Sequence, residues 1–239
     1  MTIFRIADFQ FEFEDSGTVL NFEVCGFGVR TADRRIVIDP WLAFDGKRAE
    51  PDASDRWQRI SDALRAADLA PEAVDTVVYT HLDGIGWAVG ADEATPNFPN
   101  ARHLIPSGEL QAFDAGERVV TEGLHVLREH GLVEPIEAPH EIAPDVMFEP
   151  WPGHTPSSGV VRVQDDDGEA LFFGHLFLHP AQVNRYDRAE IEADPAATVA
   201  ARVRLLDEAT ARGSVLYGDL WDSPGYGKVT KDGDRYQLV

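Results

Sequence analysis

The stretch Val77-Val78-Tyr79-Thr80-His81-Leu82-Asp83-Gly84-Ile85-Gly86-Trp87 decides how the chain folds. An apolar run rich in β-branched residues ends in a threonine, a histidine and an aspartate, and glycine follows at once. Such a run is typical of a buried strand, which we expect over residues 74–80. The residues directly after a buried strand are commonly site residues, because loops carry chemistry on a rigid scaffold. His81 and Asp83 are therefore the first candidate site residues.

This stretch resembles the signature of the metallo-β-lactamase superfamily, which reads Thr-His-x-His-x-Asp-His and continues with an apolar residue and glycine. A tryptophan after that glycine, here Trp87, is similar to the lactonase-like branch. In the superfamily, the histidines and the aspartate of the signature hold two metal ions. The resemblance therefore implies a metal-binding origin for this segment.

The signature is degenerate in this chain, and two alignments are open. Aligned on the residues before it, the chain matches through Leu82 and lacks two residues before Asp83. Aligned on the residues after it, nothing is missing, but Tyr79 replaces the first histidine. In both alignments His81 and Asp83 remain, and Gly84 replaces the last histidine.

Further segments resemble the superfamily in the same order along the chain. The resemblance makes His154 a metal ligand, puts His175 where an aspartate bridges two metals, and puts Asp219 where a histidine binds the second metal. The aspartate that commonly follows an early strand is matched by Asp39. The matching segments are Pro152–Pro156, Leu171–His175, His179–Val183 and Val215–Asp219.

The resemblance runs nearly end to end and implies an α/β fold, the four-layer αββα sandwich of metallo-β-lactamase type. We expect one domain over residues 1–239. The sequence pattern alone supports strands followed by helices, twice over, without a linker or an internal repeat.

A carboxylate can bridge two ions at the spacing of a dinuclear centre, and an imidazole cannot. With histidine at 175, the resemblance implies at most one ion, and Zn, Fe and Mn suit the remaining donors. The tentative ligands are His81, Asp83, His154, His175 and Asp219. The alternative is a site without metal, in which His154, His175 and Asp83 are the catalytic groups and the two imidazoles act as general acid and base.

Three functions stay open at this stage. The first is a divergent enzyme acting on a small acyl, lactone or ester-like substrate with at most one metal ion. The second is a metal-independent acid–base enzyme, such as a cyclase or isomerase of a small-molecule pathway. The third is a catalytically inactive binding or scaffold protein. Ligand-type residues at 154, 175 and 219 favour chemistry over the scaffold.

Composition excludes some classes of partner. The net charge of −21 disfavours phosphate backbones, so we expect no nucleic-acid binding. Cys25 is the only cysteine, which excludes an intrachain disulfide and a cysteine-based zinc site. The sequence shows neither a signal peptide nor an apolar run of membrane-spanning length. We therefore expect a cytoplasmic protein with a small-molecule substrate and no membrane partner; a homodimer stays open.

Periodicity and capping residues predict the other elements. Ser107 is expected to cap a short helix, and Val199, Val203, Leu206 and Thr210 to form the buried stripe of the last helix. His103 is placed on a strand flank and His140 on a loop. The predicted elements are a hairpin over 3–30, a strand over 35–39, helices over 55–69, 107–115, 119–129 and 194–212, and strands over 102–106, 146–151, 159–164, 170–174 and 214–217.

Overall fold

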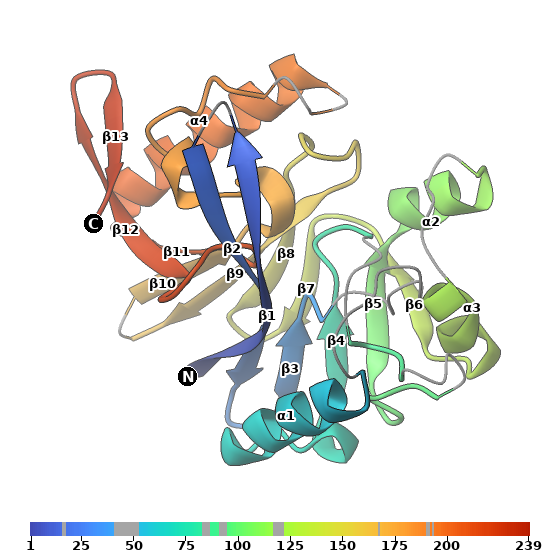
Figure 1. Cartoon of the computed structure of the whole chain (residues 1–239). Helices are drawn as coiled ribbons and strands as arrows, with labels where there is room; N and C mark the ends of the chain where they lie inside the picture. Colours follow the sequence, from blue (N-terminus) through green and yellow to red (C-terminus); the bar gives the residue numbers. More distant parts are fainter. Residues whose placement is uncertain are drawn as a thin grey trace. The chain divides into compact units, whose positions relative to one another are not determined.

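The structure is a computed structural model (Figure 1), and it describes residues 1–15, 18–40, 53–82, 87–90, 95–116, 122–166, 168–189, 192 and 194–239. The candidate site residue Asp83 lies outside these residues, as does Gly84, which replaces the last histidine of the signature. Two compact units are present: residues 1–8 with 25–137, called unit 1, and residues 9–24 with 138–239, called unit 2. One domain over 1–239 stays a prediction.

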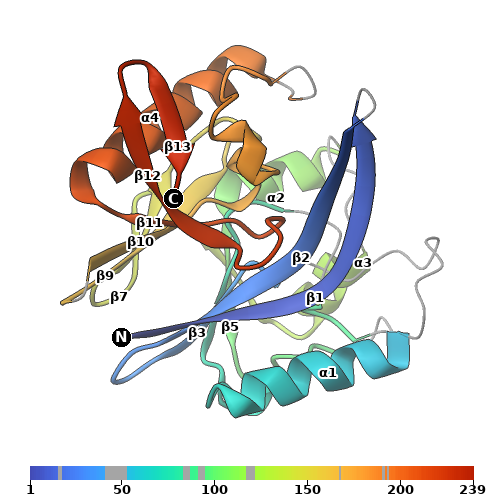
Figure 2. The ribbon, with the colours of Figure 1, turned by 60° about the vertical axis from the view of Figure 1, so that its left-hand side comes forward.

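A six-stranded sheet supplies the strands of unit 1. The long hairpin formed by β1 and β2 contributes residues to both units (Figure 2), and β2 pairs antiparallel with β3. The strands from β3 to β6 are parallel. Their order is β1 (Thr2–Asp15), β2 (Thr18–Arg30), β3 (Arg35–Ile38), β4 (Thr76–Val78), β5 (Arg102–Pro106) and β6 (Val133–Ile136).

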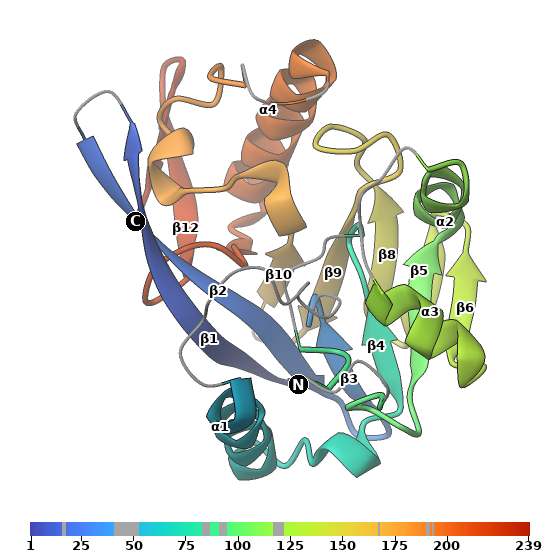
Figure 3. The ribbon, with the colours of Figure 1, turned by 45° about the vertical axis from the view of Figure 1, so that its right-hand side comes forward.

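Figure 3 shows the helices of unit 1 beside this sheet. Their apolar residues join the same core cluster as residues of its strands. In α1, Ile60 and Leu64 lie one helical turn apart and share a core cluster with Val77 of β4 and Leu124 of α3. This spacing places apolar side chains on one face of a helix. The helical elements are α1 (Ala53–Ala66), the short η1 (Pro71–Ala73), α2 (Ser107–Asp114) and α3 (Glu122–Glu129).

A seven-stranded sheet forms the centre of unit 2. Neighbouring strands are antiparallel except β10 and β11, which pair parallel with Phe172 opposite Tyr217. Their chain segments therefore end at the same edge. The order is β13 (Arg235–Leu238), β12 (Tyr226–Asp232), β11 (Val215–Tyr217), β10 (Gly168–Phe172), β9 (Gly159–Asp165), β8 (Val146–Pro150) and β7 (His140–Ala143), and two short turns, η2 (Gly174–Leu176) and η3 (Pro180–Gln182), follow β10.

The helix α4 (Pro195–Arg212) covers this sheet and lies beside β12 (Figure 2). Asp194 caps its first turn by accepting the Ala197 N–H, and Gly213 ends it in the left-handed conformation. The predicted stripe is wrong, because only Leu206 of it is buried. The buried residues are Thr198, Ala201, Arg202, Leu205, Leu206 and Ala209. The buried face of α4 contains the charged residue Arg202, which a hydrophobic pattern does not identify as buried.

Two sheets with helices confirm the predicted α/β class. Three local expectations are wrong. Strand β6 was not predicted because Pro135 interrupts it, and an edge strand tolerates proline. His140 begins strand β7 and is not on a loop. Ser107 is not a cap, since its hydroxyl donates to the Ile136 carbonyl and Pro106 takes the cap position. Among the described residues, no helix combines the length and apolarity that crossing a membrane requires.

Candidate functional site

In unit 1, His81 follows the end of β4. This strand lies between β3 and β5, and its valines are fully buried. The Tyr79 N–H continues the ladder by donating to the Leu104 carbonyl. The next residue, Thr80, turns toward Asp39, and its N–H and hydroxyl donate to the two carboxylate oxygens over 2.7 and 2.9 Å. The imidazole of His81 comes directly after this anchor and is 1% exposed.

The hydrogen bonds of Thr80 decide which ring nitrogen of the neutral His81 carries the hydrogen. The Thr80 hydroxyl gives its hydrogen to Asp39, because an ionised carboxylate only accepts. Toward Nδ1 of His81, 3.2 Å away, the same oxygen can then only accept. His81 therefore carries its hydrogen on Nδ1 and presents the lone pair of Nε2. This is the arrangement of a metal-ligating histidine with an oriented ring.

Two buried carboxylates support the segment around His81. Asp39 is 1% exposed and takes a φ of +50°, a left-handed conformation that aspartate tolerates better than most residues. Glu109 on α2 is also 1% exposed and accepts the Leu82 N–H over 3.1 Å. The sequence indicated Asp39 and gave no signal for Glu109. Asp83 lies outside the described residues, so its role stays a prediction.

In unit 2, His154 stands on the loop between β8 and β9. The loop is closed by the Trp151 N–H donating to the Ser158 carbonyl, and the Ser158 hydroxyl bonds back to Trp151 and Thr155. Gly153 suits this place, because a Cβ atom would come within 3.1–3.3 Å of Leu176 and of residues on α4, which is a tight contact. The glycine thus lets the loop approach α4 and points His154 at its partners.

His175 lies on the turn η2, just after β10. Gly174 before it takes a φ of +54°, which turns the chain away from the strand. Asp219 follows the parallel neighbour β11, so both residues come to the same sheet edge. Their side chains approach to 3.5 Å between Nε2 of His175 and Oδ2 of Asp219, and Asp219 is 1% exposed.

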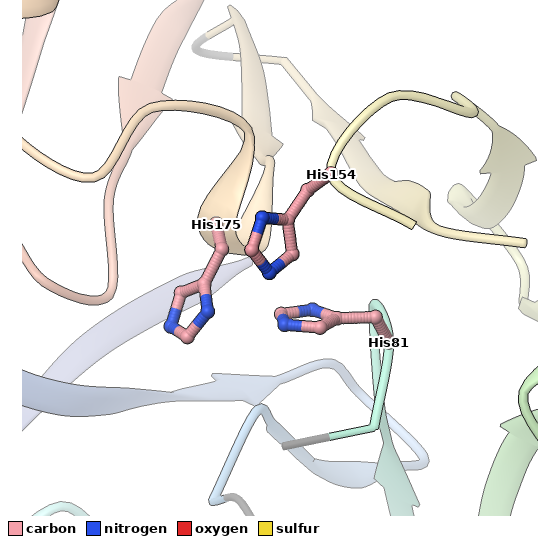
Figure 4. Close-up of side chains that lie close together, drawn as sticks. All are labelled: His81, His154 and His175. Carbon is pink, nitrogen blue, oxygen red and sulfur yellow. The ribbon is translucent and has the colours of Figure 1, made fainter. Parts of the chain in front are cut away.

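The structure brings His154 and His175 together. Their ring centroids lie 5.2 Å apart and the ring planes are at 82° (Figure 4). The His154 side chain is 22% exposed and His175 is buried. Two imidazoles at this separation, with a buried carboxylate beside one of them, are a donor set that suits a divalent transition metal. The same pair also suits proton transfer.

Sequence reasoning missed two residues of this arrangement, Glu192 and Arg202. Oε2 of Glu192 lies 2.8 Å from Nδ1 of His154, and Oε1 accepts from Arg202 over 3.2 Å. Neither residue belongs to a segment that resembles the superfamily. The only available signal was the position of Arg202, one turn after Thr198 and one before Leu205, on what proves to be the buried face of α4.

The remaining histidines and aromatic residues have structural roles. Nδ1 of His179 caps η3 by accepting the Ala181 N–H, and burial lowers the pKa of this ring. His103 is fully buried on β5 beside the Tyr79 hydroxyl, not on a strand flank, and burial lowers its pKa to about 4. Tyr79, Trp87, Phe177 and Trp221 all belong to the buried cores of their units.

Comparison with known proteins defines the family. The model of the metallo-beta-lactamase superfamily matches residues 28–218. The chain belongs to the metallo-β-lactamase superfamily. This match includes residues of both units and every candidate site residue except Asp219, and it confirms the resemblance found in the sequence. None of the curated proteins matches the chain.

Solved structures of this superfamily have the same fold at low sequence identity. The hydrolase AbOPH of the beta lactamase superfamily aligns with a TM-score of 0.83 at 18% identity, over 99% of this chain and 93% of that one. AidC, a dizinc quorum-quenching lactonase, aligns at 0.81 and 14%, with the same coverage. A probable metal-dependent hydrolase from Staphylococcus aureus aligns at 0.78 and 15%, over 100% and 96%. The predicted metallo-β-lactamase-type fold is therefore confirmed.

Proposed function

We propose that this protein is a hydrolase that acts on a small acyl substrate of the lactone or ester type, with one divalent metal ion, for which the resemblance to the superfamily supplies His81, His154 and His175 as ligands. Zn, Fe and Mn are the ions that this donor set suits. Asp219 and Asp83 complete the proposed site. The proposal agrees with the family, whose similar solved structures include a dizinc lactonase and a metal-dependent hydrolase.

The orientation of His154 is the observation that carries the proposal. Its Nδ1 faces the Glu192 carboxylate at 2.8 Å, and its ring lies against His175. His81 has the same pattern in its own unit, with Nδ1 on the Thr80 hydroxyl. Both rings are therefore held by Nδ1, which gives Nε2 the lone pair that a metal needs.

The residue at 175 limits the number of ions. A second ion would need a carboxylate at that position, and Asp219 lies 3.5 Å from the imidazole that replaces it. Gly84 also removes a histidine that the superfamily signature would supply. A single ion with three imidazoles leaves a coordination position for the substrate, as in catalytic metal sites.

An ion of this kind, when bound, supplies Lewis-acid polarisation of the substrate carbonyl. The residues of the chain do the remaining work. Asp219 lies 3.5 Å from Nε2 of His175, and Glu192 fixes the His154 ring through Nδ1. We assign to the Asp83 carboxylate the transfer of a proton, which it takes from the attacking water and gives to the leaving alkoxide oxygen. Hydrolysis then consumes one water and yields a carboxylic acid and an alcohol.

One observation also favours a second candidate function. A carboxylate on Nδ1 of a histidine is the arrangement that prepares Nε2 to accept a proton. The Glu192–His154 pair has this geometry, with His175 next to it. A metal-independent acid–base enzyme, such as a cyclase or isomerase, would use His154 as base and His175 as acid.

Chelator treatment separates the two candidates. The protein should be purified without chelator and assayed on a panel of lactones and carboxylic esters, before and after removal of metal. The proposal expects hydrolysis that the chelator abolishes and that added zinc restores. Activity that the chelator leaves intact would support the acid–base candidate instead.

Alanine variants test the site itself. His154→Ala should abolish activity in either mechanism, whereas His125→Ala, on the exposed side of α3, should leave it unchanged. Activity that survives His154→Ala would contradict both candidates, whereas a wild type that is inactive on the whole panel would favour the scaffold. The substrate within the acyl class, the homodimer and the cytoplasmic location stay predictions.

A further inference from the structure

Glu192 of unit 2 faces His154, and its own partner Arg202 has no role in the chemistry proposed so far. The side chain of Glu192 is 2% exposed and that of Arg202 is 0% exposed. Burying an ion pair costs several kcal/mol per ion before any attraction is regained. Such a pair is retained when its hydrogen-bond partners are well placed. The groups that Glu192 and Arg202 contact therefore show which parts of the chain the pair keeps in position.

Arg202 donates hydrogen bonds both to the chain next to His175 and to the carboxylate that faces His154. Its Nε donates to the Leu176 carbonyl over 2.6 Å, directly after His175. Its Nη1 donates to the Arg188 carbonyl over 2.5 Å, and its Nη2 to Oε1 of Glu192 over 3.2 Å. The guanidinium also lies over the Phe177 ring at 5.4 Å. One rigid, planar group therefore joins the turn that carries His175 to the carboxylate that faces His154.

Glu192 uses one oxygen for each neighbour. Oε1 accepts from Arg202, and Oε2 lies 2.8 Å from Nδ1 of His154. An ionised carboxylate has no hydrogen to give, so the hydrogen of this bond belongs to Nδ1. The neutral His154 ring then carries its lone pair on Nε2, and His175 lies beside it.

We propose that Glu192 and Arg202 form a positioning pair: Glu192 fixes the Nδ1–H tautomer and the orientation of His154, and Arg202 fixes Glu192 together with the turn that carries His175. The tautomer follows from unit 2 alone, and its consequence for metal affinity rests on the proposed function. Neither residue is proposed to touch the substrate or the ion.

Glutamine at 192 tests the proposal because its two ends differ. Arg202 offers only donors, so it takes the amide oxygen. The amide nitrogen then faces Nδ1 of His154, which must accept. The ring is driven to the Nε2–H tautomer, which offers no lone pair at Nε2. Aspartate at 192 keeps the charge but is one methylene shorter, so it separates positioning from simple electrostatic attraction.

The first readout is the tautomer of His154 in the metal-free full-length chain. Long-range ¹H–¹⁵N spectra at about pH 8, above the ordinary range of histidine titration, distinguish Nδ1–H from Nε2–H rings. The His154 signals are assigned by their loss in His154→Gln. We expect Nδ1–H in the wild type and in Glu208→Gln, and Nε2–H in Glu192→Gln.

The second readout is zinc affinity, measured by competition with a chromophoric chelator. Glu192→Gln should weaken zinc binding about 10- to 100-fold, the range typical for partners of metal ligands. Glu192→Asp should weaken it about 10-fold, whereas a purely electrostatic role would leave it at the wild-type value. Glu208→Gln is the matched control, since Glu208 pairs with Arg162 and Arg212. If Glu192→Gln does not fold, Glu192→Asp and its spectrum decide.

The outcomes distinguish the two proposals. An Nδ1–H ring in Glu192→Gln, or zinc affinity equal to that of Glu208→Gln, would overturn the positioning pair. The wild type could bind no zinc while its His154 ring is Nδ1–H and that of Glu192→Gln is Nε2–H. This result would overturn the metal-dependent function and leave the positioning of His154 standing.

Discussion

The two units orient their histidines by different means. In unit 1, His81 is oriented by the residue before it, because the Thr80 hydroxyl connects the ring to Asp39. In unit 2, His154 is oriented by Glu192, which is 38 residues away in the chain and is itself held by Arg202. The connection through the Thr80 hydroxyl is neutral and local in the sequence, whereas the connection through the Glu192 carboxylate is charged and distant in the sequence. The same ring orientation is thus reached by a short motif in one unit and by tertiary structure in the other.

The largest expected effect comes from removing the oriented histidine of either unit, His81 or His154. His81→Ala and His154→Ala should each lose the tightly held ion and lower hydrolysis by more than about 100-fold, beyond what partners of ligands cause. Metal content after dialysis and initial rates measure this. The comparison would break if His81→Ala kept the ion, because His81 would then not be a ligand.

The next effect concerns stability. Arg202→Met should lower the free energy of unfolding by about 3–5 kcal/mol, because it leaves Glu192 buried without its cation. Arg212→Met is the control, since its exposed side chain should cost less than about 1 kcal/mol. Chemical unfolding followed by circular dichroism measures both. Equal losses in the two variants would show that the buried pair contributes nothing special.

Unit 1 contains a buried histidine with no charged partner among its described contacts, His103. Burial lowers its pKa from 6.5 to about 4, so the unfolded chain takes up the proton first as the pH falls. The free energy of unfolding should therefore decrease between pH 6.5 and 4, by about 3 kcal/mol in all from this group. His103→Gln should remove that part of the pH dependence. His125→Gln, at an exposed position, should retain it.

The smallest effect tests the neutral connection in unit 1. Thr80→Val keeps the shape of the side chain and removes the hydroxyl between Asp39 and His81. A neutral hydrogen bond contributes about 0.5–1.5 kcal/mol, so zinc affinity should fall by no more than about 10-fold. Thr76→Val, on the same strand, is the control. A loss larger than that of Glu192→Gln would reverse the comparison between the units.

The sequence predicted what short segments determine. The strand before His81, the loop of His154 and the strand end before His175 each occupy a few consecutive residues, and the α/β class followed from their order. Glu192 and Arg202 could not be predicted in this way, because their partners are distant in the chain. The stripe of α4 was misplaced for the same reason: hydrophobic periodicity treats Arg202 as a surface residue, and the structure buries it with carbonyl partners.

The number of ions tests the central claim most directly. The wild-type protein should be purified without chelator and its metal content measured by elemental analysis against protein concentration. We predict about one Zn, Fe or Mn ion per chain, because His175 occupies the position of the bridging carboxylate. Two ions per chain that are lost together in His175→Ala would contradict the account, and so would a chain that holds none.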